Sequence, residues 1–259
     1  MVYFYNAFGI TPTKNYEAAG YDWYIPNIDN NDKELIENLV KPALKETYDI
    51  DERQLHELIA FFKTNISDRF YLDIDDDPET LEYNKKAREC FEHNIYNVVL
   101  LYLSYVGKTK NWLDTFGNPL VYPVMSFVHT NLLFDIEKGV PGIKLSKDDT
   151  LLINSGIKEI VPTEHAGVFF NKSGRASSGY DVRACVVDED YTGYVLLNVA
   201  FTGQDSSNSI IYCGDKLIQQ LILPLYKSKS EQISEDVFNK LTSKSLRGSA
   251  RFGSSNEKH

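Results

Sequence analysis

The C-terminal half of the chain contains the stretch Val186-Val187-Asp188-Glu189-Asp190-Tyr191-Thr192-Gly193. The β-branched residues before it and the glycine that closes it are typical of two strand ends that meet at a turn. The turn combines three carboxylates with one aromatic ring. Alone, such a turn is most often a solvated hairpin end, so its meaning depends on the rest of the chain.

Four further stretches combine turn residues with charged or hydroxyl side chains. They are Ala19–Asp22, Asn171–Gly174, Gly214–Lys216 and Arg247–Ser255. In this order and with these spacings, the five stretches resemble the five motifs of the trimeric all-β dUTPases (deoxyuridine 5′-triphosphate nucleotidohydrolases). The resemblance covers about residues 1–25 and 143–255.

The composition is that of an ordinary globular protein, with 42% apolar and 25% charged residues in 259. The net charge of −10 argues against a nucleic-acid groove, which needs an excess of Lys and Arg. A single polyphosphate is still acceptable, because a few local donors and a metal ion can hold it. The three cysteines form no Cys-x-x-Cys pair, which argues against zinc and a disulfide framework.

The sequence also predicts a protein without a membrane segment. The N-terminus lacks a basic leader and a long apolar run, so no signal peptide is expected. The longest apolar stretch, around Ile95–Val106, is too short and too polar to span a bilayer. We therefore expect a cytoplasmic protein, located in the host cytoplasm if its source is viral.

Residues 26–140 have the apolar spacing of helices. Asp77 is a good N-cap, and Pro78 fits the first helical position after it. One stripe runs from Phe91 to Tyr105, and Gly107 can end that helix. Pro42 should kink or end an earlier helix, and a further helix is expected at Met125–Ile136.

Short strand-like runs separated by turn residues dominate after Lys144. The fold class we predict is mainly β: a dUTPase-like β-barrel or jelly-roll (β-clip) domain with an inserted α-helical block. The predicted β domain comprises residues 1–25 and 141–259, and the helical insertion comprises residues 26–140. One short helix is expected near the end, at Ser234–Leu241. The strands expected after Lys144 are Leu151–Ile153, Gly156–Val161, Gly167–Phe170, Tyr194–Ala200, Ile210–Tyr212 and Leu217–Leu223.

The resemblance implies a role for the acidic turn. Asp188 would hold and deprotonate the water that attacks the α-phosphorus of dUTP, giving dUMP and pyrophosphate. Tyr191 would pack on the deoxyribose and leave no room for a 2′-hydroxyl. Main-chain groups of a preceding hairpin at Val182–Val187, including those of Val182 and Val187, would recognise uracil.

The resemblance also implies groups that hold the phosphates. Ser173, flanked by Lys172 and Gly174, would donate to the oxygen that bridges the α- and β-phosphates. Asp22 would organise the water shell of Mg²⁺, the expected cofactor. The remaining substrate-binding residues would be Gln219, Arg247, Phe252 over the uracil, Gly253, and Ser254 at the γ-phosphate.

In the family, three subunits build each active site and the C-terminal tail reaches across between them. The resemblance therefore implies a homotrimer.

Three alternatives stay open. A dCTP deaminase would need an acid within Tyr194–Asn198, where none occurs. An all-α dUTPase would need paired acidic helices, for which the second acid pair is not convincing. A regulatory protein would bind a protein partner through the helical insertion.

Overall fold

The computed structural model describes the chain in two units, Met1–Leu225 and Tyr226–His259, and each is treated by itself. In the second unit, one short helix, α8 (Glu235–Thr242), begins after the N-cap Ser234, as predicted within one residue. The described residues are 1–15, 17–69, 77–107, 111–184, 186–204, 209–226 and 230–244, with the backbone alone at 66–69.

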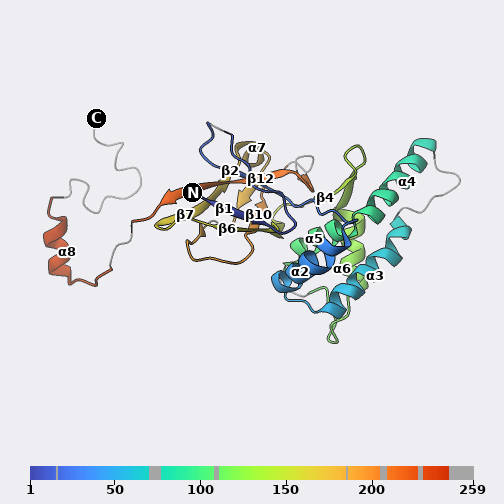
Figure 1. Cartoon of the computed structure of the whole chain (residues 1–259), viewed down its shortest axis with the longest axis horizontal. Coiled ribbons are helices and arrows are strands. Elements are labelled where there is room, and N and C mark those ends of the chain that lie inside the picture. Colours follow the sequence, from blue (N-terminus) through green and yellow to red (C-terminus); the bar gives the residue numbers. More distant parts are fainter. Residues whose placement is uncertain are drawn as a thin grey trace. The chain divides into compact units, whose positions relative to one another are not determined.

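The β part of the first unit consists of antiparallel strands in several small sheets (Figure 1). The sheet orders are β1-β6, β5-β10-β8, β11-β4-β3 and β2-β12-β7-β9. The strands are β1 (Tyr3–Asn6), β2 (Tyr21–Tyr24), β3 (Leu132–Asp135), β4 (Val140–Lys144), β5 (Thr150–Asn154), β6 (Ile157–Ile160), β7 (His165–Asn171), β8 (Tyr180–Val182), β9 (Val186–Val187), β10 (Leu196–Phe201), β11 (Ile210–Tyr212) and β12 (Lys216–Pro224).

All six strands expected after Lys144 are present, with ends shifted by at most two residues. Their alternating or continuous apolar character follows from burial on one or both faces. Strand β2 lies in the same sheet as β7 and β12, although more than a hundred residues separate it from them. N-terminal and C-terminal segments therefore build one β structure, in agreement with the predicted mainly β fold class.

The longest strand, β12, lies at the centre of the sheet that carries most of the motif residues. Gln219 on β12 lies opposite Asp22 on β2 and opposite Phe170 on β7. On the other side of β7, Gly167 lies opposite Val187 of β9. The strand register thus fixes where each motif stands along this sheet.

The interior of the β part contains a polar chain among aromatic rings. Trp23 is fully buried and packs edge-on against Phe169, with ring centroids 5.4 Å apart. Its indole Nε1 donates to Gln220 Oε1 at 3.1 Å, and Gln220 Nε2 donates to Glu159 Oε1 at 2.6 Å. Since Glu159 belongs to β6, this chain joins the two-stranded sheet to the four-stranded one.

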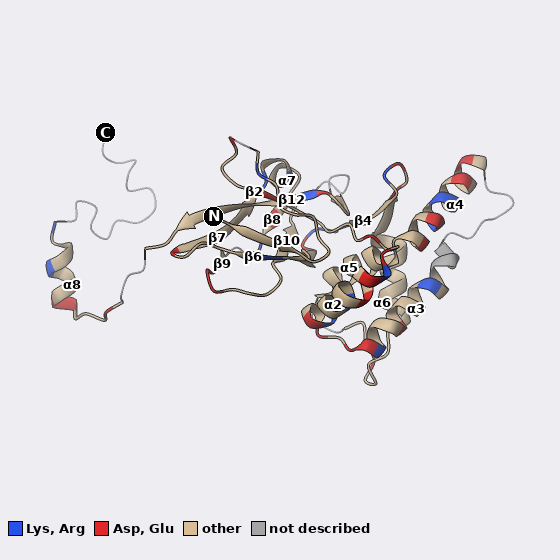
Figure 2. Cartoon of the chain, viewed as in Figure 1, with Lys and Arg blue, Asp and Glu red and all other residues tan. Residues whose placement is uncertain are grey.

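Between β2 and β3 the chain is helical, as predicted, and these helices lie together at one end of the unit (Figure 1). Charges of both signs alternate along them (Figure 2), for example in the Lys41–Glu37 pair at 2.7 Å. The helices are α1 (Lys33–Leu35), η1 (Ile36–Val40), α2 (Lys41–Tyr48), α3 (Glu52–Arg69), α4 (Pro78–His93), α5 (Ile95–Val106), α6 (Val121–Ser126) and η3 (Phe127–Asn131).

Three expectations about the helices need correction. Pro42 does not end the helical run, because the wider π-turns of η1 precede it and place it in the first turn of α2. The stripe that ends at Tyr105 is divided between α4 and α5 at Asn94, whose φ of −128° is not helical. The helix expected at Met125–Ile136 ends at Asn131, and β3 follows because it pairs with β4.

A buried polar seam joins the helices to the β part. The Tyr48 hydroxyl at the end of α2 donates to the Leu152 carbonyl at 2.9 Å and accepts from the Asn154 amide at 3.2 Å. The same hydroxyl lies 2.8 Å from Ser104 Oγ on α5. Asn154 Nδ2 also donates to Thr47 Oγ1 at 2.6 Å. Helix and sheet therefore share hydrogen bonds as well as apolar contacts.

In the described part of the chain, no helix combines the length and apolarity that crossing a membrane requires.

Candidate active site

Asp188 stands directly after the two-residue strand β9, where the chain leaves the sheet. Its carboxylate is exposed, while Val187 before it is buried. The turn is closed by a hydrogen bond from the Tyr191 amide to the Asp188 carbonyl at 3.2 Å. A cavity of about 230 Å³ adjoins the turn and is lined by Phe169, Ala184, Val186, Val187, Asp188, Tyr191, Val195 and Leu196. An exposed carboxylate thus borders a mainly apolar cavity.

Tyr191 is held on this turn by contacts at the hydroxyl end of its ring. The hydroxyl donates to the Tyr194 carbonyl at 2.6 Å. A Cβ added to Gly193 would lie 2.6 Å from the Tyr191 hydroxyl oxygen and 2.8 Å from Cζ. Glycine is therefore required at position 193 for the ring to fold back this way, and the ring stays 41% exposed, free to contact a ligand.

The segment Val182–Val187 is not the hairpin that we expected. Its first strand, β8, pairs with β10, whereas its second, β9, pairs with β7 in a different sheet. The segment crosses between sheets because β8 and β9 have different partner strands, and the Val182 amide donates to Asn171 Oδ1 at 2.7 Å. Residue 185 lies outside the described residues. The backbone groups of Val182 and Val187 therefore belong to two sheets.

Asp22 forms the centre of a compact charge cluster. Its carboxylate oxygens accept hydrogen bonds from Lys172 Nζ at 2.8 Å and from Lys216 Nζ at 2.9 Å. Burial opposes the charged form, but the two lysines together outweigh it and hold the pKa of Asp22 below its ordinary value. Lys216 is not among the predicted site residues, although it belongs to the Gly214–Lys216 motif.

Ser173 begins the short helix α7 (Ser173–Ser177), and Lys172 and Gly174 stand on either side of it. The helix is fastened to the β11–β12 turn by Arg175. Its Nη2 binds Asp215 Oδ2 at 2.8 Å, and its Nε donates to the Lys216 carbonyl at 3.0 Å. Asp215 in turn accepts from the Tyr212 amide at 3.0 Å. Arg175 therefore joins the end of the Asn171–Gly174 stretch to the Gly214–Lys216 stretch, and Gln219 lies on the adjoining strand β12.

The remaining predicted residues, Arg247, Phe252, Gly253 and Ser254, lie outside the described residues. Their proposed contacts with uracil and phosphate stay predictions.

The described motif residues occupy two ends of one sheet. Val187, the residue before Asp188, pairs with Gly167 near the start of β7. Lys172 and Ser173 come directly after Asn171, the last residue of β7. At about 3.3 Å per residue, the five steps from Gly167 to Lys172 span about 17 Å. Within one chain, the acidic turn and the lysine cluster therefore do not converge on a single phosphate group.

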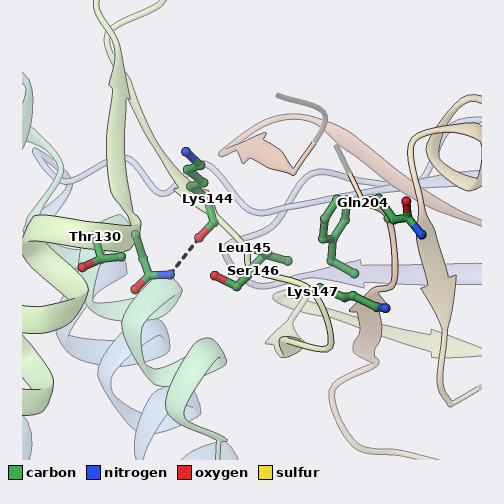
Figure 3. Close-up of a pocket in the computed structure, with 9 residues that line it drawn as sticks. Thr130, Lys144, Leu145, Ser146, Lys147 and Gln204 are labelled. Atoms are coloured by element: carbon green, nitrogen blue, oxygen red, sulfur yellow. Dashed lines mark hydrogen bonds between the residues drawn. The ribbon is translucent and has the colours of Figure 1, made fainter. Parts of the chain in front are cut away.

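A pocket near the helices contains none of these motif residues. It has a volume of about 350 Å³ and lies where η3 meets β4 and the end of β10. Figure 3 shows that Lys144 and Lys147 extend from different sides of the Leu145–Ser146 segment. Asn131 Nδ2 donates to the Lys144 carbonyl at 2.8 Å. The two ammonium groups do not converge in this view, so the pocket is not a second candidate active site.

Comparison with protein families identifies most of the β part. Residues 141–256 match the family model described as dUTPase. This segment is similar to the dUTPase family. The fold class is accordingly a dUTPase-like, mainly β domain that is accompanied by helices. No curated protein matches the chain.

Solved dUTPase structures are also similar to parts of the chain. The native dUTPase of EIAV is 23% identical over 41% of this chain and 93% of its own, with a TM-score of 0.30. A Staphylococcus bacteriophage 80alpha dUTPase variant with dUpNHpp is 19% identical over 44% of this chain and 80% of its own, with a TM-score of 0.38. A dUTPase variant from phage phi11 of S. aureus, described with a structural Mg(II) ion, is 18% identical over 36% of this chain and 78% of its own, with a TM-score of 0.32.

Proposed function

We propose that this protein is a cytoplasmic, Mg²⁺-dependent dUTP diphosphatase that converts dUTP to dUMP and pyrophosphate. The observation that carries the proposal is the position of Asp188: it is exposed at the edge of a cavity, beside Tyr191, inside the segment that matches the dUTPase family model. A carboxylate at such an edge can hold and deprotonate a water molecule.

The reaction is a displacement at the α-phosphorus. Asp188 accepts a proton from the bound water while the water oxygen forms a bond to that phosphorus. The bond from the α-phosphorus to the bridging oxygen breaks, and pyrophosphate leaves with the bonding electron pair. Ser173 donates a hydrogen bond to that oxygen, where negative charge develops, and Lys172 adds positive charge nearby.

Mg²⁺ would supply charge neutralisation on the phosphate oxygens. No group of three or more candidate ligands among His, Cys, Asp and Glu occurs in the described part of the chain, which fits an ion held mainly by phosphate oxygens and waters. Both oxygens of Asp22 already bind lysines, so its carboxylate suits contact through a water better than direct ligation. Gln219 and the tail residues Arg247 and Ser254 would hold the phosphates, while Tyr191 and Phe252 would hold the nucleoside.

A homotrimer is part of the proposal. The acidic turn and the Asp22–Lys172–Lys216 cluster lie at opposite ends of β7 in one chain. A second copy brings the two ends together if each site takes its Asp188 turn from one subunit and its Ser173 from the next.

The decisive experiment measures pyrophosphate release from dUTP, dCTP, dTTP and UTP with Mg²⁺. We expect release from dUTP, and we expect Asp188→Asn to keep nucleotide binding while losing turnover by at least about 100-fold, because the amide cannot accept the proton. Asp190→Asn, on the same turn, is the matched control and should keep turnover. If Asp188→Asn hydrolyses dUTP at the parental rate, the proposed base is wrong.

A second candidate function, binding of a protein partner by the helical segment, has one specific observation in its favour. The Leu113–Pro119 hairpin exposes Phe116 by 80% at its tip. This tip is held rigidly, because Asp114 Oδ1 accepts the Phe116 amide at 2.8 Å and Arg53 Nη2 donates to the Phe116 carbonyl at 3.0 Å. A rigid, exposed aromatic ring is typical of a binding anchor. Deamination lacks comparable support, since Tyr194–Asn198 contains no acid.

A further inference from the structure

The three carboxylates of the acidic turn differ in their surroundings. Asp188 and Asp190 are exposed, whereas Glu189 between them is half-buried. The Glu189 carboxylate turns back against the β part, where its Oε2 accepts a hydrogen bond from the backbone N–H of Glu164. Glu164 belongs to the loop between β6 and β7, twenty-five residues earlier in the chain. The middle acid of the turn is thus used within the protein.

The loop that receives Glu189 has a fixed shape. Glu164 adopts a left-handed backbone conformation with φ of 61°, which few non-glycine residues do. Neighbouring hydrogen bonds keep it there: the His165 amide donates to the Pro162 carbonyl at 3.1 Å, and the Leu225 amide donates to the Glu164 carbonyl at 2.7 Å. The Glu164 side chain is exposed, so this residue acts through its peptide groups.

The strand before the turn cannot fix Asp188 by itself. Strand β9 has two residues, and its pairing with β7 ends at Val187 opposite Gly167. Beyond Val187, the position of the turn depends on contacts made by the turn residues themselves. The Glu189–Glu164 hydrogen bond is such a contact, and it begins one residue after Asp188. A displacement of about 1 Å in a reacting group can cost about 100-fold in rate.

We propose that Glu189 is a positioning residue for dUTP hydrolysis: by binding the Glu164 amide, it holds the Asp188 turn where the carboxylate can direct water at the α-phosphorus. The inference rests on the proposed function. It assigns to Glu189 no contact with the nucleotide and no proton transfer. The chemistry at this position requires only an oxygen acceptor, so glutamine should replace glutamate.

The test compares Glu189→Ala, Glu189→Gln and the neighbouring control Asp190→Ala. For each, kcat and KM for dUTP are measured, together with the Kd and the number of binding sites for the α,β-imido analogue of dUTP. We expect Glu189→Ala to lower kcat by about 100-fold and to leave analogue binding within about threefold, because the misplaced carboxylate affects the chemical step. Glu189→Gln and Asp190→Ala should keep kcat within about threefold of the parent.

A readout independent of turnover is hydrogen exchange of the Glu164 amide, which should become faster in Glu189→Ala and stay slow in Glu189→Gln. The inference is overturned if Glu189→Ala keeps the parental kcat, if kcat and the number of analogue sites fall in the same proportion, or if glutamine does no better than alanine. A parent that releases no pyrophosphate from dUTP would overturn the proposed function instead, and amide exchange would then decide whether Glu189 holds the turn.

Discussion

Glu159 shows at the scale of one residue how burial changes ionisation. It is 3% exposed, its Oε1 accepts from Gln220, and its Oε2 has no hydrogen-bond partner in the described part of the chain. Burial raises the pKa of this carboxyl from 4.5 to about 7, and the hydrogen bond from Gln220 only partly opposes that rise. No charge-paired partner compensates a deprotonated Glu159, so its neutral form suits the interior.

The raised pKa makes folding stability depend on pH. Between pH 4.5 and about pH 7 the folded state binds more protons at Glu159 than the unfolded state does, so this group's contribution to the unfolding free energy falls as the pH rises. The loss approaches about 3 kcal/mol. Glu159→Gln does not titrate and keeps an acceptor for Gln220. The difference in unfolding free energy between the variant and the parent should therefore rise, in favour of the variant, by about 2–3 kcal/mol between about pH 5 and about pH 8.

Urea unfolding of both proteins measures the unfolding free energy of variant minus parent at each pH. Comparing the two pH values then removes the contribution of the other carboxyl groups, which both proteins share. A gap between parent and variant that is the same at both pH values would mean that Glu159 is not buried in its neutral form. This residue was not selected from the sequence, because nothing in Ile157–Ile160 distinguishes an inward-facing glutamate from an outward-facing one until the partner strand is known.

At the scale of elements, local patterns predicted what local interactions determine. Asp77 caps α4 through the amides of Glu79 and Thr80, as expected from the Asp-Pro pair. The failures have non-local causes: Leu132–Asp135 is a strand because β4 is available for pairing, and Val182–Val187 crosses between sheets because β8 and β9 have different partners. For the same reason, motif order identified Asp22 and Lys172, while the pairing of Lys216 with Asp22 needed the strand register.

The seam between α2 and β5 gives a prediction at this scale. Tyr48→Phe removes one hydroxyl from a buried set that includes the Leu152 carbonyl and the Asn154 amide. Leaving such groups without a partner typically costs about 1–3 kcal/mol. We expect the variant to lose that amount in urea unfolding, in a single transition seen by both helix and sheet signals. Tyr122→Phe, where the ring is 82% exposed, should be neutral.

Two separate transitions in Tyr48→Phe would instead show that the helices and the β part unfold independently. The proposed division into a β domain at 1–25 and 141–259 and an insertion at 26–140 stays a prediction that this experiment addresses. The hydrogen bonds across the seam favour joint unfolding, since Tyr48 and Thr47 of the helical part have partners at Leu152 and Asn154 of the β part.

At the scale of the whole molecule, the separation of Asp188 from Ser173 along β7 leads to a complementation experiment. If one site takes its acidic turn from one subunit and its serine from the next, two inactive variants can restore each other. Asp188→Asn and Ser173→Ala should each lose about 100-fold or more in turnover. The two variants are unfolded together and refolded in equal amounts. Random assembly then leaves both groups intact in about a quarter of the sites, because each of the two contributing subunits carries the required intact group half of the time.

Activity should therefore recover to about a quarter of the parental value in the refolded mixture, and it should not recover when the variants are refolded apart and then combined without exchange. A site contained within one chain predicts no recovery under either condition, because every chain then carries a defect. Sedimentation of the refolded mixture supplies the control, since a failure to recover is informative only in assembled protein. Recovery in the mixture alone would establish that Asp188 and Ser173 of one site come from neighbouring copies.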